Sequence, residues 1–467
     1  MRPRLLPAFG CAILLAGCAA SPPPALPQGD VPAAFQQAVP SNAPLWPAAD
    51  WWRSFDDAQL SALMAAAQVN NLDLAQAAAR LRQADARARQ AGAVLLPSVN
   101  LNSDINSLYG AADGTSQRET DWSAALGASY ELDFWGKNRD ALDAANALRA
   151  ASAADRATVA LTVTAAVADS YFRLLSLRER IGTARANLKS AQDILNLVQR
   201  RVQAGYAANA DLTLQRAGLA AEEGVLPALE QQELESRDAL AILLGRPPEG
   251  FTVTGEDLSA ITAPVVAPGL TTQLLTRRPD IASAEANLIA AHADLKAARA
   301  AFLPDISLTA TAGAAYPALN AAIAQLPGTG FAAGLGGSLM QAIFDGGKLA
   351  ARNDEAKARE DELLATYRAS VIAGFSDVEN ALGNLSHLQT QEAALQSQVS
   401  ESEKVLAAAQ RKYSGGYADF LTVTDAERAL YAARDQLSDM HRARLSASVA
   451  LYKALGGGWE EKPEPQP

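Results

Sequence analysis

Residue types that carry enzyme chemistry are scarce in this chain. It holds only three histidines, and they are widely spaced: His292, His387 and His441. They therefore supply neither a cluster of metal ligands nor a histidine-based catalytic triad. Gly346-Gly347-Lys348 resembles a phosphate-binding loop only in part, because Ala342 replaces the required first glycine and Leu349 stands where Ser or Thr is needed. We expect no enzyme, no metal site and no cofactor.

The N-terminus carries the one clear chemical signal. Two arginines precede an apolar stretch, and Leu15-Ala16-Gly17-Cys18 forms a lipobox. In bacteria this pattern predicts that residues 1–17 are a signal peptide, with cleavage before Cys18 and acylation of its thiol and new amine. The alternative is an ordinary signal peptide that happens to contain a cysteine. Because Ala19 follows, not Asp, a Gram-negative sorting rule predicts the outer membrane.

Composition argues against several further classes of protein. Cys11 is removed with the signal, so we expect no disulfide and no thiol chemistry in the mature chain. The net charge of -11 argues against a nucleic-acid partner. Outside the signal we find no run of about 18 apolar residues, so a membrane span would have to be made of strands. We expect residues 18–50 to form a lipidated N-terminus and extended linker, and residues 460–467 a disordered tail.

One long pattern occurs twice, and each copy pairs alternating strands with a very long helical hairpin. Asp73 aligns with Asp280 at an offset of about 207 positions, whereas Gly205 aligns with Gly416 at an offset of about 211. About four extra residues therefore lie between the paired strands of the second copy. The predicted repeats are residues 51–250 and residues 251–459.

Alternation of apolar and polar residues predicts two strands per repeat, over about residues 98–134 and about residues 305–344. The polar segment Tyr109–Thr120 is predicted to be the loop between the first two strands. Aromatic residues at the ends of the run from Trp122 to Phe134 are typical of the girdle of a membrane barrel.

Four strands are too few to close a membrane barrel, since the smallest known has about eight. An open sheet edge in lipid would leave backbone groups unpaired, at several kcal/mol each. We therefore predict that the chain oligomerises, and three copies would supply about twelve strands.

Each strand pair is followed by a predicted helical hairpin, over about residues 138–244 and about residues 349–455. The outgoing helix of the first hairpin would span about 100 Å, and its apolar residues alternate steps of three and four, as in a coiled coil. Asn209 and Asp419 suit the N-caps of the returning helices. The returning helices are shorter than the outgoing ones. The helices that precede the strands are therefore expected to stack on the ends of the returning helices.

These residues resemble the TolC-like outer-membrane factor family, in particular its lipoprotein branch of the OprM and NodT type. Besides the lipobox, the matching strings are RRPDI at 277–281, AARAAFLP at 297–304, FDGGK at 344–348, YSGGYADFLTVTD at 413–425 and LYKALGGGW at 451–459. The resemblance covers the chain from about Trp51 to Trp459. It implies a mainly α fold with a β-barrel portion: a homotrimeric twelve-stranded outer-membrane β-barrel continued by a long periplasmic α-helical barrel.

The resemblance implies the outer-membrane channel of a tripartite efflux system, a passive trimeric duct for drugs or other solutes. The implied partners are two further copies of the chain, a periplasmic adaptor (membrane fusion protein), an inner-membrane pump of the RND type and outer-membrane lipid. The implied location is the cell outer membrane, lipid-anchored and extending into the periplasm. A structural coiled-coil lipoprotein, or an adaptor without a pore, is the alternative, but it leaves the four alternating strands unexplained.

The resemblance also implies a periplasmic gate at the helical tips of the second repeat. The family's tip tyrosine matches Tyr413, its constricting apolar ring matches Leu421, and its tip aspartate matches Asp425. Three Leu421 side chains around an axis could exclude water, and three Asp425 carboxylates would attract cations. The alternatives are that Leu421 belongs to the core and that Asp425 caps a helix. Ala418 stands where TolC has an arginine, so we expect no gate latched by that arginine.

Overall fold

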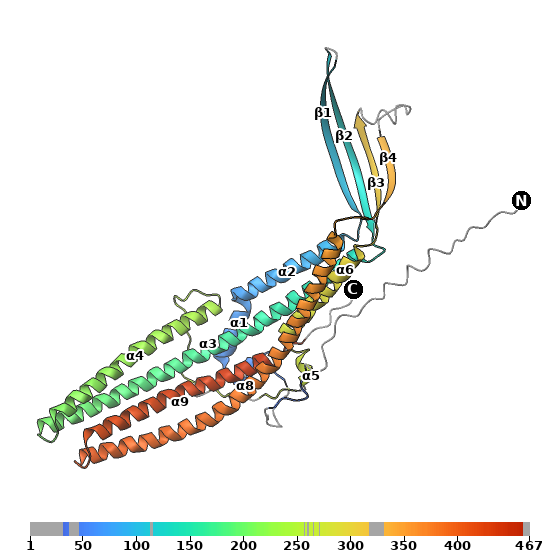
Figure 1. Ribbon diagram of the computed structural model, residues 1–467. Coiled ribbons are helices and arrows are strands. Elements are labelled where there is room, and N and C mark those ends of the chain that lie inside the picture. The colour runs from blue at the N-terminus through green and yellow to red at the C-terminus, as the bar shows by residue number, and fades with distance from the viewer. Residues whose placement is uncertain are drawn as a thin grey trace. The chain divides into compact units, whose positions relative to one another are not determined.

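The chain is mainly helical, with four strands (Figure 1). The computed structural model describes residues 31–36, 46–112, 115–255, 257–258, 261–264, 266–269, 271–316 and 331–460. The predicted signal peptide, Cys18 and nearly all of the predicted C-terminal tail lie outside these residues. The described chain forms two compact units: a strand unit from Val99–Ala144 and Leu288–Arg368, and a helical unit from Val31–Ser98, Ala145–Asn287 and the residues from Ala369 onward.

The four strands form one sheet in the order β1-β2-β3-β4. Their bounds are β1 Ser98–Ala112, β2 Thr115–Leu132, β3 Asp305–Tyr316 and β4 Phe331–Met340. Strands β2 and β3 pair antiparallel with Leu126 opposite Ala312, and β3 pairs antiparallel with β4. The outer edges of β1 and β4 have no partner strand among the described residues.

The predicted loop Tyr109–Thr120 is wrong in its extent. Strand β1 continues to Ala112 and β2 begins at Thr115, so most of this polar segment is strand. Polar composition is a weak guide here, because strand formation depends on pairing with the neighbouring strand more than on intrinsic preference.

Ion pairs fix the junction between the strands and the first long helix in the strand unit. The Lys137 ammonium lies 2.7 Å from a carboxylate oxygen of Glu131 on β2 and 2.6 Å from one of Asp305 on β3. Asp133 accepts hydrogen bonds from the first backbone amides of the helix. The Trp135 indole donates to the carbonyl of Pro304 at 2.9 Å. These contacts use side chains from both repeats.

Corresponding helices of the two repeats have equal lengths, which confirms the duplication. Helices α2 and α6 have 22 residues each, α3 and α8 have 67 each, and α4 and α9 have 35 each. Their bounds are α2 Leu72–Ala93, α6 Pro279–Ala300, α3 Lys137–Gln203, α8 Lys348–Ser414, α4 Asn209–Leu243 and α9 Phe420–Ala454. Shorter elements are η2 Trp51–Phe55, α1 Ala58–Asn70 and α5 Thr271–Leu274.

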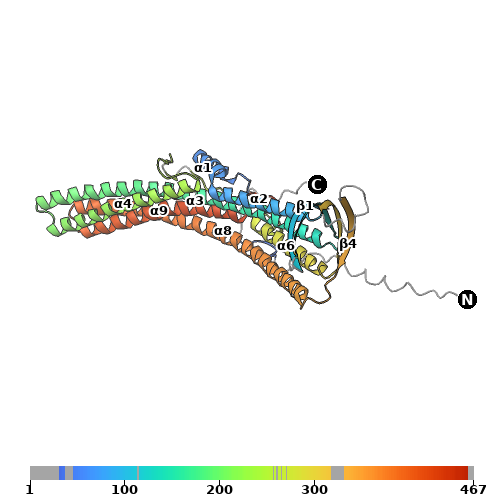
Figure 2. The ribbon, with the colours of Figure 1, turned by 90° about the horizontal axis from the view of Figure 1, so that it is seen from above.

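In the helical unit the hairpins α3–α4 and α8–α9 run side by side (Figures 1 and 2). Seam residues of α3 such as Leu174 and Val198 are fully buried, as the coiled-coil spacing predicts. One segment of α3 is long and apolar enough to cross a membrane, by length and composition only, contrary to the expectation that no helix would be. Half of that segment is buried inside the protein.

The predicted end-to-end stacking is confirmed in both repeats. The Asn71 amide, just before α2, donates to the carbonyl of Leu243 at the end of α4, at 2.8 Å. The Arg278 guanidinium, just before α6, donates to the carbonyl of Ala454 at the end of α9, at 3.1 Å. In each case a polar side chain satisfies a carbonyl left unpaired at a helix end.

Of the two predicted N-caps, one is confirmed and one is wrong. Asp419 caps α9, because its carboxylate accepts from the backbone amide of Thr422 at 3.1 Å. Asn209 is the first residue of α4, and Ala208 before it occupies the N-cap without a side-chain hydrogen bond. The Asn209 prediction is therefore wrong.

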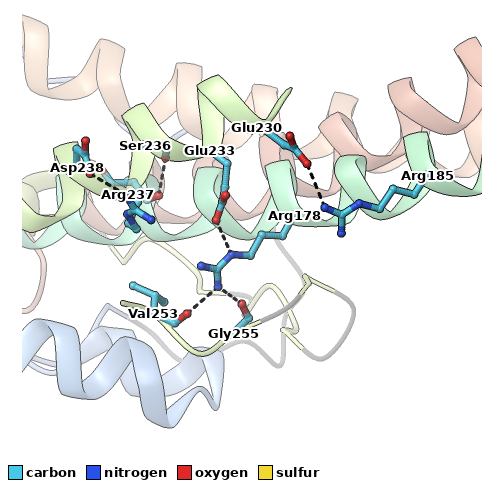
Figure 3. A network of polar contacts seen from close by, with 10 residues as sticks. Arg178, Arg185, Glu230, Glu233, Ser236, Arg237, Asp238, Val253 and Gly255 are labelled. Atoms are coloured by element: carbon cyan, nitrogen blue, oxygen red, sulfur yellow. Dashed lines mark hydrogen bonds and ion pairs between the residues drawn. The ribbon is translucent and has the colours of Figure 1, made fainter. Parts of the chain in front are cut away.

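An arginine holds the segment that links the repeats against the first hairpin (Figure 3). The Arg178 side chain on α3 bonds Glu233 on α4 at 3.0 Å and donates to the carbonyls of Val253 and Gly255. Next to it, Arg185 pairs with Glu230 at 3.1 Å. The segment around Val253 and Gly255, which links the repeats, thus packs against the first hairpin.

Candidate functional site: the tips of the helical hairpins

Short turns close both hairpins. Gly205 and Gly416 have positive φ values of 77° and 76°, which other residues adopt only with strain. These glycines follow the ends of α3 and α8 and turn the chain into α4 and α9. The three gate candidates of the second repeat, Tyr413, Leu421 and Asp425, flank the second turn.

Tyr413 lies in the packed interior of the tip. Its side chain is 4% exposed and its ring centroid lies 5.2 Å from that of Phe420, across the turn. The Arg201 guanidinium carbon, on α3, lies 4.6 Å from the same ring, a cation–π geometry. Burial raises the pKa of Tyr413, and the charge of Asp211 adds to the rise while Arg201 opposes it. Tyr413 therefore joins the two hairpins of the chain.

Leu421 and Asp425 lie on the outer face of α9. Leu421 is 53% exposed and Asp425 is also exposed, whereas Val423 and Ala426 face the core. A spacing of four residues puts Leu421 and Asp425 on one helix face, one turn apart. Leu421 is thus not a core residue of the chain, and Asp425 does not cap α9, a role that Asp419 fills.

Sequence reasoning missed Arg201, which connects the two tips. Its guanidinium donates to the carbonyl of Ser414, the last residue of α8, at 2.8 Å. A basic residue in the last turn of a helix is a weak signal for such carbonyl binding. Here the carbonyl belongs to the neighbouring hairpin, and only the packing of the hairpins reveals that pairing.

An exposed tyrosine also stands at each turn. Tyr206 is 77% exposed and Tyr417 is 87% exposed. They occupy equivalent positions in the two repeats, directly after the turn glycines. Among the described residues no group of His, Cys, Asp and Glu could hold a metal ion. The tips thus present aromatic and carboxylate side chains on a helical framework.

The comparisons with known proteins agree with this architecture. The family described as Outer membrane efflux protein matches residues 63–246 and 270–457, one match for each repeat. The chain belongs to this family. It is an outer-membrane channel of an efflux system, passive and without enzyme activity.

Relatives match over nearly their full length. The chain is 39% identical to the pyoverdine export outer membrane protein OpmQ of Pseudomonas putida, covering 98% of each protein. It is 30% identical to the cation efflux system protein CusC of Escherichia coli K12, covering 97% of this chain and 99% of CusC. It is 32% identical to the toluene efflux pump outer membrane protein TtgC of Pseudomonas putida, covering 97% and 95%.

Solved structures show the same fold. The outer-membrane channel OprN superposes with a TM-score of 0.86 at 30% identity, covering 95% of this chain and 100% of that one. A crystal structure of CusC superposes with a TM-score of 0.82 at 28% identity, covering 94% and 100%.

Proposed function

We propose that three copies of this chain form a continuous duct, with a twelve-stranded barrel in the outer membrane and a helical barrel in the periplasm. The observation that carries the trimer is the pair of open edges on β1 and β4, which lack partner strands among the described residues. Pairing β4 of one copy with β1 of the next satisfies these edges, and closure by three copies leaves none.

The sheet also offers a face suited to lipid. Leu126 and Ala128 on β2 share one face with Ala310 on β3 and Leu335 on β4. Leu335 is 90% exposed in the single protomer. In the proposed barrel this apolar face contacts lipid, because a soluble sheet would bury such a surface. The acylated Cys18 at the start of the segment of residues 18–50 adds a second attachment to the same membrane.

We propose a periplasmic adaptor and an inner-membrane pump of the RND type as the partners that load the duct. The exposed tip residues Tyr206 and Tyr417 suit such contacts, since aromatic side chains are enriched at protein interfaces. The relatives named above export pyoverdine, cations and toluene through similar chains. We infer that the pump selects the cargo and that the duct conducts the solutes that the pump delivers.

We propose that the tip of the second hairpin is the gate. Leu421 supplies the apolar constriction, Asp425 supplies a cation-attracting ring one turn further along, and Tyr413 anchors the tip to the neighbouring hairpin. The exposure of Leu421 supports this assignment, because an apolar side chain left outside the protomer core is free to meet its copies around an axis.

The test is Leu421→Ala in planar lipid bilayers. Truncating an exposed side chain should change folding stability by no more than about 0.5 kcal/mol, so trimers should form normally. Widening a narrow apolar constriction should raise conductance and admit bulky antibiotics without an active pump. Val405→Ala, which truncates a 56% exposed residue of α8, is the matched control and should conduct as wild type does. Unchanged conductance in Leu421→Ala trimers would place the constriction elsewhere.

A further inference from the structure

A carboxylic acid lies inside the helical unit without a cationic partner. Glu427 on α9 is 5% exposed. No Lys, Arg or His nitrogen of the described residues forms an ion pair with it. A buried, unpaired carboxylate is costly, and the usual resolution is that the group takes up a proton. Glu427 lies less than two turns beyond Leu421 on the same helix.

The direct contact of Glu427 is a tyrosine that also reaches the other hairpin. The Tyr431 hydroxyl oxygen lies 3.2 Å from a Glu427 carboxyl oxygen and 3.3 Å from the backbone carbonyl oxygen of Asn187. Asn187 belongs to α3, so Tyr431 bridges hairpin α8–α9 to hairpin α3–α4. Both distances are compatible with hydrogen bonds, and both partners are oxygen atoms. The Ser190 hydroxyl of α3 also hydrogen-bonds Tyr431.

Counting protons shows that the two contacts compete. A hydroxyl has one proton to donate and can accept two hydrogen bonds. When Glu427 is ionised it can only accept, so Tyr431 must choose between the carboxylate and the Asn187 carbonyl. When Glu427 is protonated it donates to the tyrosine oxygen, and the tyrosine proton is free for Asn187. Only the protonated form lets Tyr431 keep its contact with Glu427 and also donate to the Asn187 carbonyl on α3, in addition to the Ser190 hydrogen bond from α3 that both forms allow.

The surrounding groups favour uptake of that proton. Burial raises the pKa of Glu427 to about 7, with the Tyr431 hydrogen bond opposing the rise and the negative charge of Glu222 on α4 adding to it. From α3 the neighbouring groups are neutral, namely Asn187 and the Ser190 hydroxyl that bonds Tyr431. The titratable groups that act on this acid are therefore Glu222 and Tyr431, and neither supplies a positive charge.

We propose that Glu427, Tyr431 and the Asn187 carbonyl form a proton-operated clasp that adds a hydrogen bond between the two hairpins when the periplasm is acidic and loses it as the pH rises, so that the hairpins part more easily at higher pH. This inference rests on the proposed function, because parting of the hairpins matters only if their tips gate a duct. The clasp is separate from the contacts of Tyr413 at the turn.

The direction of the effect follows from linkage. The folded, clasped protein binds a proton at Glu427 more tightly than the free side chain does. The stabilisation is therefore fully present below the unfolded pKa of about 4.3 and is lost as the pH rises through the folded value. Between the two values, the ratio of clasped to unclasped protomers changes by up to about tenfold per pH unit.

The first test is the thermal unfolding midpoint of the detergent-solubilised, full-length protein between pH 5 and pH 8. Glu427→Gln is a neutral variant of the same shape whose amide can donate to Tyr431. The wild-type midpoint should fall relative to that of Glu427→Gln as the pH rises. Glu223→Gln removes the same charge at an exposed site of α4 and should follow wild type. Parallel curves for wild type and Glu427→Gln would overturn the proposal.

A double-mutant comparison separates the clasp from simple burial of a charge. At pH 8, Glu427→Gln should raise the midpoint more in the wild-type background than in a Tyr431→Phe background, because only Tyr431 transmits the donated hydrogen bond to α3. An equal rise of the unfolding midpoint in both backgrounds would show that Tyr431 is not part of the clasp.

The second test is bilayer conductance with the periplasmic side held at pH 5.5 or pH 8. Wild type should open less often at pH 5.5, whereas Glu427→Gln should stay at the lower level at both values. A wild-type protein that never conducts would refute the proposed duct, while the unfolding curves would still decide the clasp. Conductance with no dependence on pH, together with a positive unfolding result, would overturn the gating role of the clasp.

Discussion

Replacing Arg278 with alanine tests whether the end-to-end junction of α9 and α6 holds the second repeat together. The Arg278 side chain is 9% exposed and bonds both carboxyl oxygens of Asp280, at 3.0 and 2.6 Å. It also bonds Asp377 on α8 at 2.9 Å and the carbonyl of Ala454 at 3.1 Å. One guanidinium thus joins the ends or sides of three helices, α6, α8 and α9.

The size of the effect follows from what the truncation leaves behind. Removing one partner of a buried ion pair costs about 3–5 kcal/mol. Asp280 and Asp377 are 38% and 54% exposed, so water takes over part of their solvation. The Ala454 carbonyl loses its partner inside the protein. We therefore expect Arg278→Ala to lower the free energy of unfolding of the helical portion by about 2–3 kcal/mol.

Urea unfolding of the detergent-solubilised protein, followed by helical circular dichroism, measures this loss. Arg277→Ala is the matched control. Arg277 pairs with the 70% exposed Glu460 at 3.4 Å and lies over the Trp46 ring, so its loss should cost below about 1 kcal/mol. If Arg278→Ala cost no more than Arg277→Ala, the junction would not depend on this side chain and the reasoning would fail.

Two further predictions concern the membrane portion. A Cβ added at Gly313 on β3 would lie 2.5 Å from the Ala124 carbonyl oxygen and 2.6 Å from the Ala125 Cα, so Gly313→Ala should sharply reduce the yield of detergent-resistant trimers on gels. A Cβ added at Gly127 would lie 3.8 Å from its nearest neighbour, the side-chain nitrogen of Asn102, so Gly127→Ala should assemble normally. Cys18→Ala behind an ordinary signal peptide should still yield membrane-embedded trimers in fractionated cells, because the barrel itself anchors the protein. Recovery of soluble periplasmic monomers would refute the barrel.

The sequence by itself determined the repeated architecture. Local periodicity and the absence of helix-breaking residues predict the helices. The offsets of about 207 and 211 positions locate the same elements in both copies. Strand bounds were less accurate. The polar residues around Thr115 belong to β2, because ladder hydrogen bonds extend a strand beyond the part that local preference favours.

Only the tertiary structure decided which side chains meet. The resemblance points to Tyr413, Leu421 and Asp425 together, but the structure places Tyr413 inside the tip and the other two outside it. Arg201 reaches Ser414 across 213 positions, and Tyr431 reaches Asn187 across 244. Such contacts arise when two hairpins pack side by side, and no local pattern in either helix encodes its neighbour. The chemistry of the tips is therefore a property of the packing of the hairpins.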